Sequence, residues 1–433
     1  RVPFTPERIS NAIYRAAVAV GGRDRTIADD LTRQVVEILE QNPDPDFTPH
    51  IEEIQDLVEK VLIENAHARV AKAYILYRDE RARRREQQDA QSARSSENIP
   101  WPKIWHVLDW ALDHGLNTVE GLNARIEAGE FSQVVTESEA AYSVEIENAA
   151  QAILERRDQL RMIIITGPSS SGKTTTTIKV GEKLKNAGMN LVTLNVDNYF
   201  FDLELHPKDE FGDYDFETPH ALDLELINEH LKRLIGGEEV MIPFYDFKTG
   251  KRTAANTPMK LHRDDLILID SLHGLFPAMT KGIDDALKFK LYLEPLMQMK
   301  GVDGEYVHWT DIRLMRRMLR DATHRAYDPR QTLEHWHYVR TSEMRHIIPN
   351  INATDILVNS AMPYELSLYA ARMKDDFHRW TEEYRWNPLK EDAFIRAERV
   401  ARLLASLIPT ADDNQVPLDS VIREFIGGSI LKY

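Results

Sequence analysis

The sequence predicts an α/β fold with a parallel sheet, preceded by a small, mainly helical region. Before about residue 159, apolar side chains recur at helical spacing, as in Ile9, Ile13 and Ala16. After Arg161, short and continuously apolar runs alternate with helical segments, a pattern typical of parallel strands that helices cover on both faces. The expected strands are Met162–Thr166, Leu191–Val196, Asp265–Asp270, Lys288–Leu293 and Asp355–Val358.

Helices are expected between and after these strands, at Thr174–Asn186, Leu222–Ile235 and Asp392–Leu407. A chain of 433 residues has room for roughly two to three domains. The stretch from Gln87 to Asn98 is polar and lacks apolar periodicity, as linkers do. We predict four regions: a helical domain over residues 1–92, a helical connector over 93–159, an α/β domain over 160–372 and a helical extension of that domain over 373–433.

Composition narrows the class of partners. The formal net charge of -16 repels nucleic acid and anionic membrane surfaces, so we expect neither as a partner. The chain contains 0 cysteines, which excludes disulfides, thiolate zinc sites and a cysteine nucleophile, and fits a cytoplasmic protein. No run approaches the roughly 18 apolar residues of a membrane-spanning helix.

The strongest motif is Gly167-Pro168-Ser169-Ser170-Ser171-Gly172-Lys173-Thr174, which leaves an expected strand and opens an expected helix. In this pattern the backbone amides wrap a polyphosphate, Lys173 reaches the β and γ phosphates, and the Thr174 hydroxyl binds Mg²⁺. The alternative is a Ser/Gly turn that caps an ordinary helix. We predict a phosphate-binding loop made by Gly167, Ser169, Ser170, Ser171, Gly172, Lys173, Thr174 and Thr175.

Two carboxylates follow expected strands. Asp197 comes directly after Leu191–Val196, at the sheet edge where open α/β sheets bind ligands. There it could accept a proton from a hydroxyl that attacks a γ phosphate, or it could cap the strand end. Asp270 ends another apolar strand, a position typical of a carboxylate that holds Mg²⁺, with a loop cap as the alternative.

Four arginines recur at spacings of three and four residues, which places them on one helix face. Such a face is usually solvated and ion-paired. Next to a phosphate loop, it can instead act as a lid that neutralises charge during phosphoryl transfer, and we favour that interpretation. The arginines are Arg313, Arg316, Arg317 and Arg320, with Arg325 just beyond.

With these residues in view, the segment from about Arg161 to Glu365 resembles the uridine kinase and phosphoribulokinase group of P-loop kinases. Besides the phosphate loop, the resemblance runs in order through Val196–Tyr199, Phe216–Asp223, Ile242–Phe247 and Arg316–Asp321. At the C-terminus, Arg423–Ser429 is similar to a bacterial branch of uridine kinase-like proteins with extra N-terminal domains. The resemblance implies a P-loop NTPase fold with a parallel sheet, of the nucleoside kinase type.

The resemblance also implies residue roles. Asp197 would be the general base, Lys173 would hold phosphate, and Thr174 and Asp270 would serve Mg²⁺. The lid and substrate pocket would include Arg317, Arg320 and Arg325, and Glu217 and Tyr245 would face the acceptor. The implied catalytic set is Asp197, Lys173, Arg317 and Arg320.

The sequence departs from true uridine kinases at the acceptor side. Glu217 stands where they have Asp, and Gly250 stands where they have a His that reads the base. Arg325-Ala326-Tyr327 replaces Arg-Gly-Arg, and Asp270-Ser271 replaces Glu-Gly. We therefore expect kinase chemistry with an acceptor other than uridine.

The N-terminal region resembles an ATP-cone, the regulatory nucleotide-binding module of ribonucleotide reductases and of their transcriptional repressor. The segment Arg1–Ile9 matches the entry of that module, and Val70–Arg78 matches its exit helix. The resemblance implies a mainly helical regulatory domain with a second site for ATP or dATP.

These expectations combine into one prediction. The chain would be an ATP- and Mg²⁺-dependent kinase that transfers the γ phosphate to a hydroxyl of a small metabolite, with nucleotide regulation by the ATP-cone and assembly into a homo-oligomer. Two alternatives remain. One is a kinase for an anionic acceptor such as 2-phosphoglycerate, and the other is a nucleotide-sensing regulator that is not a metabolic enzyme.

Overall fold

The structure, a computed structural model, describes residues 5–41, 49, 51–75, 98–207, 214, 217–324 and 328–432. The chain divides into two compact units. The smaller unit comprises Arg1–Glu97 with Glu383–Glu391, and the larger unit comprises Asn98–Glu382 with Asp392–Tyr433. The boundary that we predict at residue 92 lies outside the described residues, so our four-part division stays a prediction.

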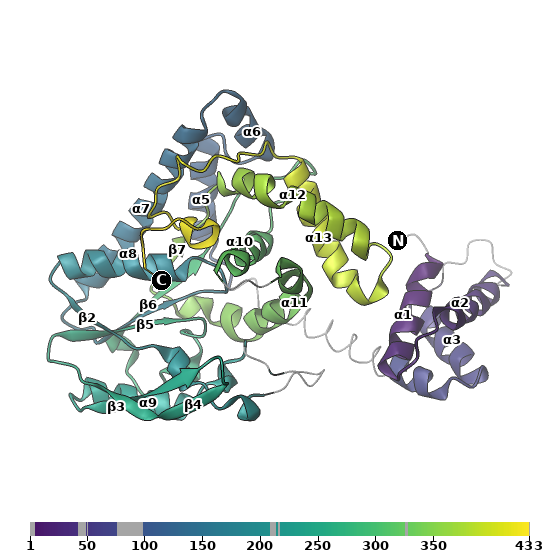
Figure 1. Cartoon of the computed structure of the whole chain (residues 1–433), viewed down its shortest axis with the longest axis horizontal. Coiled ribbons are helices and arrows are strands. Elements are labelled where there is room, and N and C mark those ends of the chain that lie inside the picture. Colours follow the sequence, from purple (N-terminus) through teal and green to yellow (C-terminus); the bar gives the residue numbers. More distant parts are fainter. Residues whose placement is uncertain are drawn as a thin grey trace. The chain divides into compact units, whose positions relative to one another are not determined.

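The described N-terminal residues of the smaller unit form helices around a core of their own. These include α1 (Pro6–Ala19), α2 (Arg25–Glu40) and α3 (Ile51–Glu64) (Figure 1). Asp24 caps α2, because its side chain accepts a hydrogen bond of 2.9 Å from the Thr26 backbone N–H. The core side chains are Ile9, Ile13, Ala16, Ala28, Leu31, Val35, Val58, Val61, Leu62, Ala71 and Tyr74.

The larger unit opens with the helices predicted as a connector, α5 (Trp101–Asp113), α6 (Val119–Glu127) and α7 (Phe131–Glu155). Helix α7 packs against α8 (Lys173–Asn186), the helix that follows the phosphate loop. The Tyr142 hydroxyl of α7 lies 2.6 Å from the Thr176 Oγ1 of α8, and both side chains are buried. The connector therefore supports the phosphate-loop helix from behind.

Five parallel strands form the central sheet in the order β2-β5-β1-β6-β7. All five coincide with the expected strands, and their bounds are β1 (Met162–Thr166), β2 (Asn190–Thr193), β5 (Asp265–Ser271), β6 (Lys288–Glu294) and β7 (Ile356–Asn359). Strand β2 ends earlier than predicted, and a 3-10 turn, Val196–Tyr199, follows it. In that turn the Asn195 side chain accepts a hydrogen bond from the Asp197 N–H, which fixes the backbone of Asp197.

An antiparallel hairpin that we did not predict adds to the unit. Its strands are β3 (Val240–Asp246) and β4 (Lys251–Met259), joined through a turn that ends at Gly250. Gly250 has a φ of +66°, which glycine adopts without a steric penalty. Helix α9 (Leu224–Ile235) packs on β3, and together they share a hydrophobic core with β1 and β5. The hairpin thereby brings Tyr245 next to the turn Val196–Tyr199.

Helices from the C-terminal half complete the unit. They are α10 (Trp309–His324), α11 (Pro329–Ser342), α12 (Glu365–Tyr384), α13 (Glu391–Ala405) and the single turn α14 (Arg423–Ile426). The predicted helix Asp392–Leu407 corresponds to α13, with bounds that differ by one or two residues. Helix α10 contacts both α11 and α14, so it links the C-terminal segment to the rest of the larger unit.

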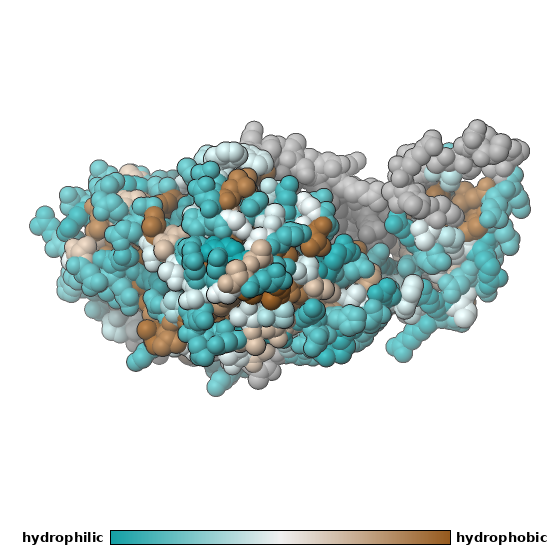
Figure 2. Space-filling model, turned by 90° about the horizontal axis from the view of Figure 1, so that it is seen from above, coloured by the Kyte–Doolittle hydropathy of each residue, from teal (hydrophilic) through white to brown (hydrophobic). Residues whose placement is uncertain are grey.

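The surface is largely polar. Figure 2 shows hydrophilic side chains over most of the visible face, with hydrophobic residues in small patches. Exposed large apolar residues include Trp101, Trp105 and Leu112 on α5. Among the described helices, none combines the length and the apolar character needed to cross a membrane.

Candidate active site

The phosphate loop runs from β1 into α8 as predicted. A Cβ added at Gly167 would lie 2.3 Å from the Leu293 carbonyl oxygen, and Gly172 has a φ of +93°, so both positions require glycine. The hydroxyls of Ser170 and Ser171 are buried, and within the described part of the chain they have no hydrogen-bond partner. Buried hydroxyls without partners are costly unless a ligand satisfies them, so this loop fits a bound polyphosphate.

Lys173 begins α8 and turns back over the loop. Its ammonium group donates a hydrogen bond of 3.1 Å to the Pro168 carbonyl oxygen. Burial lowers the pKa of Lys173, while the negative charges of Asp270 and Glu424 act in the opposite direction. Lys173 therefore lies close enough to Asp270 and Glu424 for their charges to act on its ammonium group.

Asp270 and Asp197 converge on Lys173 because of the strand order. Strand β5 lies between β2 and β1, and Asp270 of β5 pairs in register with Ile165 of β1. Burial raises the pKa of Asp270 to about 6. The positive charge of Lys173 lowers this pKa, whereas the negative charges of Glu424 and Asp197 raise it further. The pKa of Asp197 is also raised by loss of hydration, and Lys173 again opposes the rise.

The magnesium roles of Thr174 and Asp270 stay a prediction. The described residues contain no group of three or more His, Cys, Asp or Glu side chains that could hold a metal ion by themselves. Mg²⁺ in kinases is usually held by one or two protein oxygens together with phosphate oxygens and water. One hydroxyl and one carboxylate beside the loop are therefore an adequate protein contribution.

The structure corrects our interpretation of two arginines as members of a lid. Arg313 and Arg316 of α10 are at most 1% exposed, and each forms a buried ion pair. Arg313 donates to Glu343 at 2.5 and 2.9 Å, and Arg316 donates to Glu365 at 2.7 and 2.9 Å. The physical reason is that acidic partners from distant segments enclose this side of α10, so neither arginine can reach a substrate.

Both buried arginines also hold the phosphate loop from behind. Arg313 Nη1 donates to the Ser169 carbonyl oxygen at 3.2 Å, and Arg316 Nη1 donates to the Ser171 carbonyl oxygen at 3.4 Å. The Ser360 hydroxyl adds a donation of 2.6 Å to the same Ser171 oxygen. Because these carbonyls point towards α10, the loop is fixed in one conformation.

The other two arginines of α10 remain near the loop. Arg317 donates to Glu217 at 3.0 Å and to the Ser169 hydroxyl at 3.1 Å, so the structure brings together two predicted substrate residues. Arg320 Nη1 lies 3.9 Å from a carboxylate oxygen of Glu424. Arg325, which we predict in the substrate pocket, lies outside the described residues.

Tyr245 lies in an aromatic group next to the turn that carries Asp197. Its ring centroid is 5.4 Å from that of Phe200 and 5.0 Å from that of Phe247. At Gly250 an added Cβ would lie 2.9 Å from the Leu203 Cβ, in a backbone conformation that favours glycine. A histidine at this position would therefore be strained, which agrees with the absence of that base reader from the sequence.

Sequence reasoning missed several residues of the site. Glu424 reaches the loop from the C-terminal segment, and Glu343 and Glu365 neutralise the buried arginines. His273 is buried close to His346, and burial lowers its pKa to about 3, so its ring is neutral. Two of these residues had a signal in the sequence: Glu424 lies in the Arg423–Ser429 motif, and Glu365 ends the segment that resembles the kinase group.

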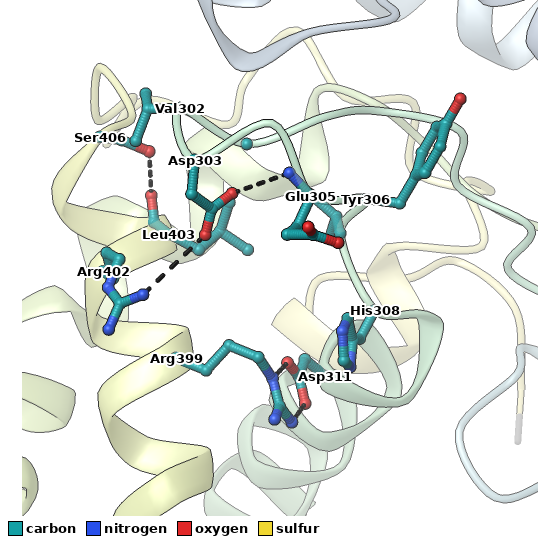
Figure 3. A pocket seen from close by; sticks show the side chains of 12 residues that line it. Val302, Asp303, Glu305, Tyr306, His308, Asp311, Arg399, Arg402, Leu403 and Ser406 are labelled. Carbon is teal, nitrogen blue, oxygen red and sulfur yellow. Dashed lines mark hydrogen bonds and ion pairs between the residues drawn. The ribbon is translucent and has the colours of Figure 1, made fainter. Parts of the chain in front are cut away.

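A separate hollow lies between α10, α13 and the loop that precedes α10 (Figure 3). Opposite charges pair across it. Arg399 donates to Asp311 at 2.6 and 2.7 Å, and Arg402 lies 4.0 Å from Asp303. Its lining contains none of our predicted site residues, and both of its arginines are paired with aspartates, so we do not assign the phosphate site to this hollow.

The loop with its lysine and the carboxylates at the strand ends define the site of a P-loop phosphotransferase. Comparison with known families agrees with this class. Residues 162–366 match the model of the phosphoribulokinase / uridine kinase family, and residues 1–83 match the ATP cone domain. The matches confirm that residues 162–366 resemble this family of P-loop kinases and that residues 1–83 resemble an ATP-cone, in agreement with the expectation of an enzyme.

Individual relatives share about a quarter of their residues with this chain. The uridine kinase of Deinococcus deserti is 28% identical over 199 residues, which are 46% of this chain and 86% of that protein. The uridine kinase of Bacillus pumilus is 29% identical over 198 residues, covering 46% and 85% of the two chains. The solved D-glycerate 3-kinase of Cryptococcus neoformans has a TM-score of 0.32 and 13% identity over 46% of this chain and 87% of its own, too little to carry weight.

We predict that Glu365→Gln destabilises the larger unit strongly. The substitution leaves the Arg316 guanidinium buried without its counter-charge, and breaking such a pair costs about 3–5 kcal/mol of unfolding free energy. Urea denaturation followed by tryptophan fluorescence measures the change. As a control, Glu229→Gln removes the exposed partner of Arg233 and should change stability little. Equal stability of the two variants would contradict a structural role for the Arg316–Glu365 pair.

Proposed function

We propose that the chain transfers the γ phosphate of ATP, with Mg²⁺, to a hydroxyl of a small metabolite. One observation carries the proposal. Three neighbouring strands deliver Lys173, Asp270 and Asp197 to the same edge of the sheet, where their charges influence one another. A cation for phosphate, a carboxylate for the metal and a second carboxylate for a hydroxyl proton are the parts that phosphoryl transfer needs.

The roles follow from these positions. The loop amides and Lys173 hold the phosphates, and Arg317 with Arg320 neutralises charge on the transferred group. Asp197 accepts the proton of the attacking hydroxyl as the new oxygen–phosphorus bond forms and the bond to ADP breaks. Thr174 and Asp270 would hold Mg²⁺, which supplies charge neutralisation between the β and γ phosphates.

The raised pKa of Asp197 suits this role. Loss of hydration raises the pKa of the Asp197 carboxyl, which makes the carboxylate a stronger base, and the charge of Lys173 opposes this rise. A merely structural carboxylate at a strand end needs no such environment. For the same reason we prefer an enzyme to a nucleotide-sensing regulator, which would not need a proton acceptor beside Lys173.

The acceptor that we favour is a neutral hydroxyl compound other than uridine. The relatives named above are uridine kinases, but this chain has Gly250 where true uridine kinases have the histidine that reads the base. An anionic acceptor such as 2-phosphoglycerate is less well supported, because Arg313 and Arg316 are already neutralised by buried carboxylates. Of the described arginines on that face, Arg317 and Arg320 are left near the loop, and Arg317 is paired with Glu217.

We predict that Asp197→Asn lowers kcat by about 10²- to 10⁴-fold while ATP affinity is kept, because the amide cannot accept the hydroxyl proton. The assay is transfer of γ phosphate from ATP to the acceptor found by screening nucleosides, sugars and hydroxy acids. Asp264→Asn, an exposed carboxylate at the start of β5, serves as the control. If kcat stays within a few-fold when chemistry limits the rate, Asp197 is not the base.

We also predict that uridine is a poor substrate. Hydrogen-bond readers in a closed pocket discriminate by roughly 10⁴-fold, and one of them is absent here. Steady-state kinetics with uridine measures kcat/KM. A value in the ordinary enzyme range of about 10⁴ M⁻¹s⁻¹ or more would show that other residues read the base.

For the ATP-cone, we propose regulation through a second nucleotide site. A full-length Lys173→Ala protein should lose phosphoryl transfer, since the lysine no longer neutralises the phosphates, but should still bind ATP or dATP. Equilibrium dialysis with labelled nucleotide measures the remaining binding, and light scattering measures a shift in assembly. Absence of binding at millimolar nucleotide would remove nucleotide regulation from the proposal.

A further inference from the structure

The C-terminal segment Ser420–Gly428 packs directly on the phosphate loop. Val421, Ile422 and Phe425 are completely buried, and the Val421 Cγ2 lies 2.4 Å from the point where a Cβ at Gly172 would stand. Helix α14 within this segment also contacts α10. The segment thus covers one side of the phosphate loop and forms a wall there, although its residues are far from the loop in the sequence.

From this wall Glu424 reaches the first turn of α8. One carboxylate oxygen accepts hydrogen bonds from the Thr175 backbone N–H at 3.2 Å and from the Thr175 hydroxyl at 2.9 Å. The other oxygen lies 3.9 Å from Arg320 Nη1. Glu424 is 5% exposed, so this charge is almost removed from water and depends on these partners.

The same groups are donors for a nucleotide. In a phosphate loop of this pattern, the backbone N–H groups at the start of the helix cradle the α and β phosphates. The Thr175 N–H carries a single hydrogen, so a carboxylate and a phosphate oxygen compete for it. Two anions at this point also repel each other strongly, because burial reduces screening by water. Glu424 and the phosphate therefore exclude each other.

We propose that Glu424 is an internal anion that occupies the α-phosphate subsite of the loop, and that ATP must displace its carboxylate to bind. The inference rests on the proposed function, because it requires ATP at this loop. Glu424 has three rotatable side-chain bonds, so its carboxylate can swing away while Val421 and Phe425 keep the segment packed. Arg320, which faces Glu424, then turns to the incoming phosphates. The contact tunes ATP affinity downwards and keeps the loop in its binding conformation between turnovers.

The test is Glu424→Gln in the full-length chain, with binding of ADP and ATP measured by isothermal titration calorimetry. The amide keeps the shape and an acceptor for Thr175 but removes the charge, so both nucleotides should bind about tenfold more tightly. Adenosine has no phosphate to compete with, and its affinity should not change. Asp419→Asn is the matched control, because Asp419 directly precedes this segment but pairs with Lys179 at 2.8 Å.

A second variant keeps the inference testable if Glu424→Gln does not fold. Glu424→Asp keeps the charge but withdraws it from Thr175, so ADP and ATP affinity should rise by a smaller factor. Circular dichroism checks that each variant is folded. If a folded Glu424→Gln or Glu424→Asp protein binds ADP and ATP with unchanged or weaker affinity, the inference is overturned.

The experiment must distinguish nucleotide binding at the loop from nucleotide binding at the ATP-cone. The gain from Glu424→Gln should vanish when Lys173→Ala is also present, because the gain arises at the loop. If single Lys173→Ala leaves all nucleotide binding unchanged, then the loop does not bind ATP and the proposed function itself fails. If Lys173→Ala weakens nucleotide binding but Glu424→Gln does not improve it, phosphoryl transfer at the loop stands as proposed and only the role of Glu424 is lost.

Discussion

The site depends on two buried ion pairs beneath the phosphate loop. Arg316 and Glu365 are both fully enclosed, and Arg313 is shared between Glu343 and Glu294. Enclosing charges is costly unless every hydrogen-bonding group finds a partner, and here the spare donors go to backbone carbonyls of the loop. The pairs therefore contribute more to a fixed loop geometry than to net stability.

This fixed geometry has a chemical consequence. The carbonyl oxygens of Ser169 and Ser171 are turned towards α10, so the opposite side of the loop is left for donors. Backbone N–H groups that face one way form an anion-binding concavity, so the loop backbone needs no rearrangement when phosphate arrives, and only the Glu424 side chain has to move aside. The lysine at the start of α8 and the carboxylates at the strand ends then surround a site of defined shape.

Local patterns made much of this predictable from the sequence. The strands and the loop depend on short-range periodicity and on glycines, so β1, β5, β6 and β7 agree with their predicted bounds to within one residue, whereas β2 ends three residues early. The spacing of the α10 arginines predicted a shared face, but not burial, because Glu294, Glu343 and Glu365 come from separate elements. The hairpin was missed because Pro243 interrupts β3, and Glu424 was missed because 249 positions separate it from Thr175.

The distribution of charge limits which ligands can enter. Near the loop, the described cations already face carboxylates: Lys173 faces Asp270 and Glu424, Arg317 faces Glu217, and Arg320 faces Glu424. A bare polyphosphate must overcome repulsion from these carboxylates and from Asp197. A polyphosphate that carries Mg²⁺ brings part of its own neutralisation, and Asp270 then becomes attractive instead of repulsive. In the proposed function, the carboxylates that oppose a free anion would therefore favour a metal-bound nucleotide.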